Sequence, residues 1–173
     1  MAGKMTIKKP LKAVWKYTGN ENNDFMYKNT QTSTPDFERR IRASFERQQV
    51  MQLLNARLQK VLPGEIHIEL PYDLKLTQQN GYLHAGIITT IVDSACGYAA
   101  YSLMPPDASV LSVEFKINLL RPAEGEYFLG VGKVVKSGRT LTVCSGEMHA
   151  FNRGEGQIVA LMQATMIAVE RKT

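Results

Sequence analysis

Two kinds of hydrophobic periodicity follow one another along the 173-residue chain. Between residues 37 and 61, apolar side chains recur every three to five positions, which is typical of one face of an α-helix. The Thr-Pro-Asp sequence at 34–36 is a helix start, with a capping hydroxyl, a proline that needs no amide hydrogen, and an acid at the positive end of the helix dipole. Because Pro-Gly at 63–64 ends the pattern, we expect a single packing helix over 35–62.

The rest of the chain combines strand patterns with one unusually apolar helix. EIHIEL at 65–70 alternates as a strand, and the segment from Ala85 to Ser102 has helical spacing until Pro105 and Pro106 stop it. Four further strands are expected at 110–120, 127–135, 140–151 and 157–169. A helix that is apolar nearly all round must be covered on several sides. The pattern therefore predicts an α+β fold in which an antiparallel sheet curls around the 85–102 helix.

Length and charge suggest one domain over 34–173 that follows a tail over 1–33. Most of the net charge of +5 comes from six lysines in the first thirty residues, which we interpret as a solvated arm. No nucleic-acid partner is expected, since aromatic and basic residues do not interleave along the strands. The apolar stretch 87–104 is interrupted by Asp93, so a membrane span is not expected either.

Two cysteines and three histidines have no metal-binding spacing, and the tail has no export or import signal. We therefore expect a cytoplasmic protein with no metal site, in which Cys96 and Cys144 are buried. No nearby sequence motif supports a cysteine nucleophile paired with His84 or His149.

Asp93 is the least expected residue of the central helix. On a helical wheel it shares a side with small residues, and the bulky Ile88 and Ile91 lie roughly opposite. The small residues are Thr89, Thr90, Cys96, Gly97 and Ala100. An ionised carboxylate is costly in apolar surroundings unless it is paired, so Asp93 is either a hydrogen-bonded structural residue or a general base or nucleophile.

His84 precedes Asp93 by nine residues, roughly half a turn away around a helix, so one chain cannot bring both into one site. If two such helices pack in a dimer, His84 of one chain could meet Asp93 of the other. Ala85 and Gly86 also leave backbone amides free at the positive helix end, where a polarised carbonyl can approach. Amide donors and a carboxylate from across an interface suit acyl transfer.

The stretch GYLHAGIITTIVDSACGYA resembles the motif of the hotdog-fold acyl-CoA thioesterases of the PaaI type, and LSVEFKINLLRPAEGE with VVKSGRTLTV is similar to that family's later strands. The resemblance covers about 70–168. It implies a hotdog fold, an active site between subunits of a dimer or tetramer, and an acyl-CoA substrate hydrolysed without a separate cofactor.

Residue by residue, the resemblance implies that Asp93 is the base or nucleophile and that the Ala85 amide polarises the thioester. It makes Gln78 the positioning amide, with Asn80 as a rival two residues on, and Ser112 the hydroxyl beside the acid. Ser112 is expected on the strand face opposite Val113, Phe115 and Ile117. Ala85 replaces the first glycine of the family's His-Gly-Gly, which implies a displaced substrate or reduced activity.

Coenzyme A carries phosphates, so a basic rim is expected on the substrate's path. The candidates are Lys133, Lys136, Arg139 and Arg121, for which ordinary exposed strand-end charges are an equal alternative. GVGKVVKSG lacks the spacing of a P-loop and does not precede a helix. Two alternative functions remain open at this point: a non-catalytic acyl-CoA-binding or regulatory module, and an enoyl-thioester hydratase of the same fold.

Overall fold

The computed structural model describes residues 34–170, and the predicted tail over 1–33 lies outside them. Its helices are α1 (Thr34–Glu46), α2 (Gln49–Leu53) and α3 (Ala85–Ser102). Its strands are β1 (Arg57–Leu62), β2 (Glu65–Pro71), β3 (Ala108–Leu119), β4 (Tyr127–Ser137), β5 (Leu141–Asn152) and β6 (Glu155–Glu170). A 3₁₀ turn at Leu74–Leu76 leads into the loop before α3.

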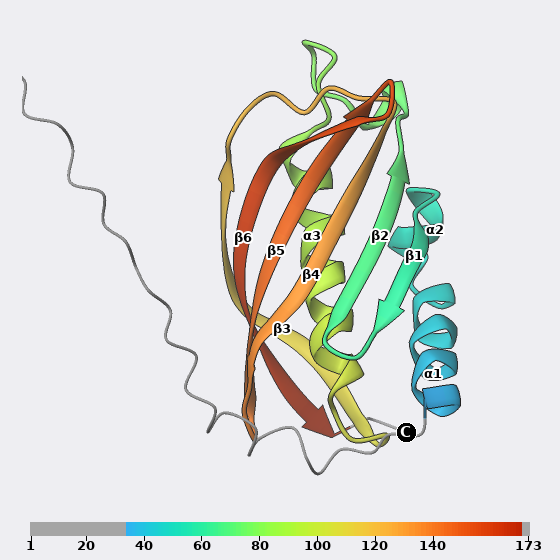
Figure 1. The fold of residues 1–173 in the computed structure, drawn as a ribbon, viewed down its shortest axis with the longest axis vertical. Coiled ribbons are helices and arrows are strands. Elements are labelled where there is room, and N and C mark those ends of the chain that lie inside the picture. Colours follow the sequence, from blue (N-terminus) through green and yellow to red (C-terminus); the bar gives the residue numbers. More distant parts are fainter. Residues whose placement is uncertain (1–33, 171–173) are drawn as a thin grey trace, which may run out of the picture. The chain divides into compact units, whose positions relative to one another are not determined.

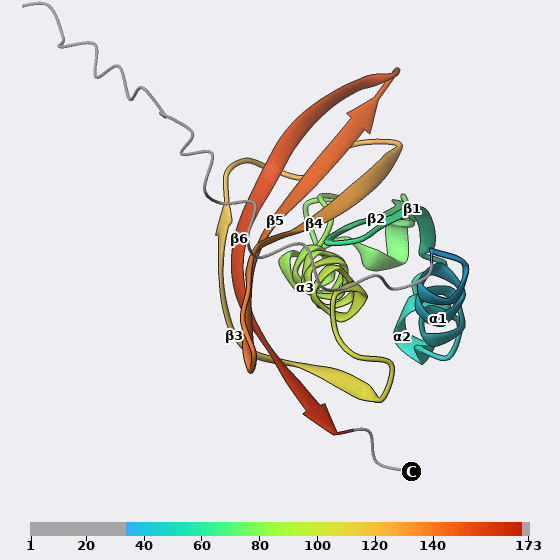
Figure 2. The same ribbon diagram turned by 60° about the horizontal axis from the view of Figure 1, so that its bottom comes forward.

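The six strands form one antiparallel sheet in the order β1-β2-β4-β5-β6-β3. Figures 1 and 2 show this sheet curving around α3, with α1 and α2 beside α3 near the β1 end of the sheet. On α3, Ile88, Ile91 and Ala95 are buried, as the sequence predicted. The α+β hotdog arrangement and the bounds of the central helix are thus confirmed.

The predicted single helix over 35–62 is wrong. The helix ends at Glu46, α2 adds a short second piece, and Asn55 at a φ of 52° turns the chain into β1. Pro63 and Gly64 form the two-residue turn of the β1–β2 hairpin, where Leu62 faces Glu65 and Gly64 has a φ of 75°. Leu58 and Val61 therefore lie on a strand.

Glycines let α3 approach the middle of the sheet. Gly130 and Gly132 on β4 and Gly146 on β5 face the helix, and a Cβ atom at any of them would overlap it. At Gly132 that atom would overlap the backbone of Ala95 and Cys96. The close approach allows a small-residue helix to fill a strongly curved sheet without large side chains between them.

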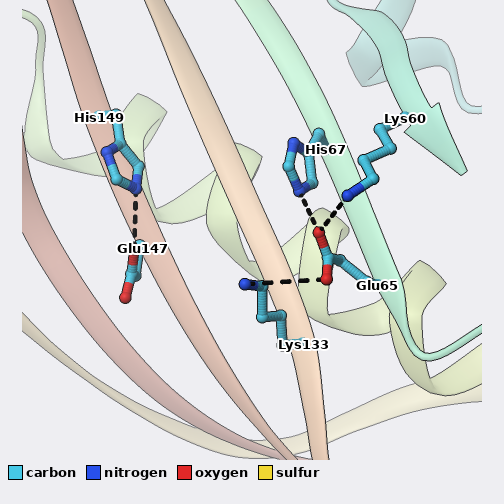
Figure 3. Close-up of polar contacts among 6 residues, drawn as sticks. All are labelled: Lys60, Glu65, His67, Lys133, Glu147 and His149. Atoms are coloured by element: carbon cyan, nitrogen blue, oxygen red, sulfur yellow. Dashed lines mark hydrogen bonds and ion pairs between the residues drawn. The ribbon is translucent and has the colours of Figure 1, made fainter. Parts of the chain in front are cut away.

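The outer face of the sheet carries a polar cluster, shown in Figure 3. Glu65 accepts from Lys60 at 2.9 Å, contacts His67 Nε2 at 2.7 Å and lies 3.7 Å from Lys133 Nζ, while His149 pairs with Glu147 at 2.8 Å. The Lys60 hydrogen bond lowers the pKa of Glu65 to about 2 against the opposing effect of burial, with His67 and Lys133 adding to it. Lys133 is thereby engaged in a structural ion pair.

No helix within residues 34–170 is both long and apolar enough to cross a membrane.

Candidate active site

Asp93 lies at the middle of α3 on the side that the sheet leaves open. It is partly exposed, and the hydroxyl of Ser112 on β3 donates to its Oδ1 at 2.7 Å. Thr89, Thr90 and Gly97 share this partly exposed side. Cys96 and Ala100, which the helical wheel placed there, are instead fully buried, because the sheet wraps further round the helix than a one-sided packing would.

A bulge in β3 decides which side chains accompany Ser112. The pairing with β6 shifts between Ser112 and Glu114. As a result, Ser112, Phe115 and Ile117 all pair with β6 residues that are buried (Met166, Ala164 and Met162), so they lie on the same side of the sheet. The expectation that Phe115 and Ile117 lie on the opposite face from Ser112 is therefore wrong. One extra residue, Val113, reverses the alternation.

The Asp93 side chain lines a hollow of about 360 Å³. Its walls come from α1 and the turn after it, from α3 and from the start of β3. Besides Asp93 and Ser112, the residues that line it include Ser44, Arg47, Gln48, Gly97, Tyr98 and Tyr101. Sequence reasoning assigned no chemistry to the α1 residues, because as positions on a packing helix they carry no motif.

The start of α3 offers one backbone donor rather than two. His84 is the N-cap residue, and its Nδ1 accepts the Gly86 N–H at 2.9 Å. Among the described residues, the Ala85 N–H has no hydrogen-bond partner. The expectation of two free amides is thus corrected to one, at Ala85, and His84 is held in a capping role within its own chain.

A second hollow, of about 310 Å³, lies at this end of α3. Gln78 and Ala85 line it together with Ile88, Leu119 and Arg121. The Gln78 side chain accepts the Asn80 N–H, while Asn80 itself lines a different hollow beside Glu124 and Glu126. Of the two rival amides, Gln78 is therefore the one that lies with Ala85.

The predicted basic residues divide between the two ends of the sheet. Arg121 lines the Ala85 hollow and donates to Gln157 Oε1 at 3.0 Å. Lys136 and Arg139 are exposed at the β4–β5 hairpin, which lies at the opposite end of the sheet from the start of α3 (Figure 1). Within one chain, these two residues do not join either hollow.

The two thiols are unsuited to nucleophilic chemistry. Cys96 and Cys144 are both fully buried. Burial raises the pKa of Cys96, and it raises that of Cys144 to about 12. His149 pairs with Glu147 on the outer face of the sheet (Figure 3), whereas both thiols are buried in the core.

Comparison with known proteins agrees with this architecture. The family model described as the thioesterase superfamily matches residues 80–157. The crystal structure of a thioesterase family protein from Silicibacter pomeroyi is 52% identical, with a TM-score of 0.77, over 78% of this chain and 99% of that one. The E. coli PaaI protein of the phenylacetic acid degradation operon shares the fold at 17% identity, with a TM-score of 0.70, over 78% of this chain and 94% of that one.

Similarity to curated proteins is lower. Human acyl-coenzyme A thioesterase 13 is 29% identical over 99 residues, which are 57% of this chain and 69% of that protein. A Halobacterium salinarum protein named for a presumed esterase activity is 31% identical over 99 residues, 54% of this chain, and the match spans 65% of that relative's length.

The match to the Silicibacter pomeroyi protein over nearly its whole length, together with the family model, shows that the chain belongs to the hotdog-fold thioesterase superfamily. Membership places it among the thioester hydrolases, as the resemblance of its sequence to the PaaI type implied.

Proposed function

We propose that the protein is an acyl-CoA thioesterase whose active site is built from two copies of the chain, in a dimer or a dimer of dimers. The observation that carries this proposal is the separation of Asp93 and Ser112 from Gln78 and Ala85, which line different hollows. Asp93 lies eight residues after Ala85 on α3, about 12 Å along the axis at 1.5 Å per residue. Reacting atoms approach within roughly 3–3.5 Å, so one chain cannot supply both groups to one thioester.

The free edge of β3 supports assembly with a second copy. β3 is the last strand of the sheet, and within residues 34–170 no strand pairs with its outer edge. Leu111 and Val113 are each more than half exposed, and Phe115 is 43% exposed. A long apolar edge of this kind invites strand addition, and a symmetric partner would cover it and bring two α3 helices together.

In this arrangement Asp93 of one protomer activates a water molecule. Its carboxylate takes a proton as the water oxygen bonds to the thioester carbonyl carbon. The partner's Ala85 N–H then stabilises the oxyanion. When the C–S bond breaks, the Asp93 carboxyl returns the proton to the CoA thiolate, leaving free acid and CoA. Direct attack by Asp93, with hydrolysis of the resulting anhydride, would use the same donor.

Neighbouring residues have supporting roles in the proposal. Ser112 holds the Asp93 carboxylate through its 2.7 Å hydrogen bond. Gln78 positions the carbonyl or the water from the Ala85 side, and Arg121 is suited to a CoA phosphate at the rim of the same hollow. An alanine amide donates as a glycine amide does, so replacement of the family's glycine by Ala85 leaves the donor in place.

The test measures thiol release from a panel of acyl-CoA esters. Asp93→Asn is expected to lower kcat by about 100-fold or more, since general-base catalysis contributes 10²–10⁴. Asp107→Asn, an exposed aspartate in the turn after α3, is the matched control and should retain full activity. Equal rates for wild type and Asp93→Asn would show that Asp93 takes no part in the reaction.

Mixing two inactive variants tests the shared site directly. Asp93→Asn and Gln78→Ala homodimers should each be inactive, while subunit exchange should restore about a quarter of wild-type activity, because half of the random dimers are mixed and each has one intact site. Failure to complement, after exchange is verified, would place both residues in one chain's site. Tight CoA-ester binding without turnover would favour the binding module, and loss of enoyl absorbance without thiol release would favour the hydratase.

A further inference from the structure

The hollow beside Asp93 has one wall that does not belong to the curled sheet and its helix. Ser44 on α1 and Arg47 and Gln48 in the turn after it face the α3 residues Tyr98 and Tyr101 across this hollow. The extra N-terminal helix therefore shapes the space next to the proposed catalytic carboxylate. Its contribution is polar, with a hydroxyl, a guanidinium and an amide.

The side-chain oxygen of Gln48 does not stabilise the local structure. Gln48 is the N-cap residue of α2, yet its side chain makes no capping hydrogen bond. Its Oε1 is buried and has no partner among the described residues. A half-turn of the amide exchanges this oxygen with the nitrogen, so the side chain can present either an acceptor or donors to a polar group nearby.

Arg47 brings a positive charge to the same wall. It forms no side-chain hydrogen bond or ion pair within residues 34–170. Burial raises the pKa of the Tyr98 hydroxyl, while the Ser44 hydrogen bond and the Arg47 charge act in the opposite direction, which is consistent with a guanidinium close to that phenol. Ser44 Oγ and Tyr98 Oη lie 3.5 Å apart.

The floor of the hollow leaves room between Asp93 and this polar wall. Gly97 lies one helical turn after Asp93, and a Cβ atom there would meet no atom of residues 34–170 within 4 Å. Tyr98 and Tyr101 line the same hollow, and Tyr98 lies close enough to Arg47 to be affected by its charge. An acyl group whose carbonyl carbon is at Asp93 could thus extend over Gly97 with its far end at Arg47, Ser44 and Tyr98.

We propose that this hollow selects acyl-CoA esters whose acyl group ends in a carboxylate, with Arg47 as the residue that recognises it. The inference rests on the proposed thioesterase function and names its substrate class. A plain alkyl tail would leave the buried Gln48 Oε1 without a partner and would offer nothing to the Arg47 guanidinium, which disfavours it. A terminal carboxylate accepts from the side-chain nitrogens of both residues, and its distance from Asp93 keeps the two negative charges apart.

The experiment compares succinyl-, glutaryl- and adipyl-CoA with butyryl-, pentanoyl- and hexanoyl-CoA, which have the same numbers of carbons, and with phenylacetyl-CoA. We expect wild type to have a kcat/KM at least tenfold higher for one of the diacid esters than for its neutral counterpart. Arg47→Gln should lower kcat/KM for the diacid ester about 10- to 100-fold, as loss of a charge-assisted hydrogen bond does, and change the neutral esters less than threefold. Arg47→Lys should recover part of the loss.

Arg42→Gln is the matched control, because Arg42 is an exposed α1 arginine paired with Glu38 and lies outside the hollow. It should leave the substrate preference unchanged. The inference would be overturned if wild type showed no preference for the diacid esters, or if Arg47→Gln had no effect on that preference. The proposed function would remain intact in that case, provided that hydrolysis of the neutral or aromatic esters depends on Asp93.

If no ester is hydrolysed, the proposed function fails, and equilibrium binding decides the inference. Glutaryl-CoA should then bind wild type at least tenfold more tightly than it binds Arg47→Gln. Equal dissociation constants would overturn the inference.

Discussion

Replacing Gly132 with alanine should destabilise the fold more than any other single added methyl group in the sheet. The new Cβ would overlap the carbonyl carbon and oxygen of Ala95 and the nitrogen of Cys96, all backbone atoms of α3. β4 cannot yield, because Gly132 is paired with Ile66 on β2 and with Gly146 on β5. α3 cannot move outward without losing the contacts of its buried face.

The magnitude follows from what must move. Overpacking of a core typically costs about 1–3 kcal/mol when side chains can adjust. At Gly132 the obstacle is helix backbone, so we expect a loss of about 3 kcal/mol or more in the free energy of unfolding and a fall in Tm of roughly 10 °C for a domain of this size. At Gly130 the nearest atom is the Cγ2 methyl of the Ile91 side chain at 2.6 Å, and the helix backbone is 3.5 Å away, so Gly130→Ala should cost less.

Thermal and urea unfolding, measured at one protein concentration, check this order. Gly97→Ala is the reference, because Gly97 is a helical glycine with open space around it among the residues that the structure describes. It should gain about 0.5–1 kcal/mol from helix propensity. A Gly132→Ala protein with a Tm within 2 °C of wild type, or one more stable than Gly130→Ala, would refute the close approach of helix and sheet.

Three further predictions concern assembly, charge and thiols. Val113→Lys places a charge on the apolar edge strand, so it should dissociate the assembly on size-exclusion chromatography and abolish thioester hydrolysis. Val135→Lys, at a similarly exposed valine, should do neither. A Val113→Lys enzyme that is dimeric and active would contradict the β3 interface. Glu65→Gln should lower the free energy of unfolding by about 1–2 kcal/mol near pH 7, since it removes three partners worth about 0.2–1 kcal/mol each. Because the pKa of Glu65 falls from 4.5 to about 2 on folding, this contribution is fully present above about pH 5 and disappears as the pH falls toward 2; a difference that is constant with pH would refute the assignment. Cys96 and Cys144 should resist Ellman's reagent in the native protein at pH 8 and should both react in denaturant, and rapid native labelling of either would contradict their burial.

The hydrophobic pattern of the sequence predicted secondary structure correctly where the bounds of an element depend on residues close to it in the chain. α3 begins at Ala85 and ends at Ser102 as its spacing and the following prolines predict, because capping and helix termination depend on nearby residues. The pattern failed at 47–62, where Leu54, Leu58 and Val61 keep a helical spacing although β1 pairs with β2. An edge strand that is only partly buried shows no clear alternation, and Pro63-Gly64 suits a hairpin turn as well as a helix end.

By itself, the sequence determined the class of fold, the central helix and the isolated carboxylate at Asp93, since these depend on periodicity and on residue type. Only the tertiary structure decided that Ser112 donates to Asp93, that a bulge at Val113 turns Phe115 to the same face, and that Arg47 and Gln48 line the Asp93 hollow. Register, curvature and the docking of α1 arise from contacts between segments far apart in the chain, and a one-residue shift in pairing is enough to reverse which face a side chain occupies.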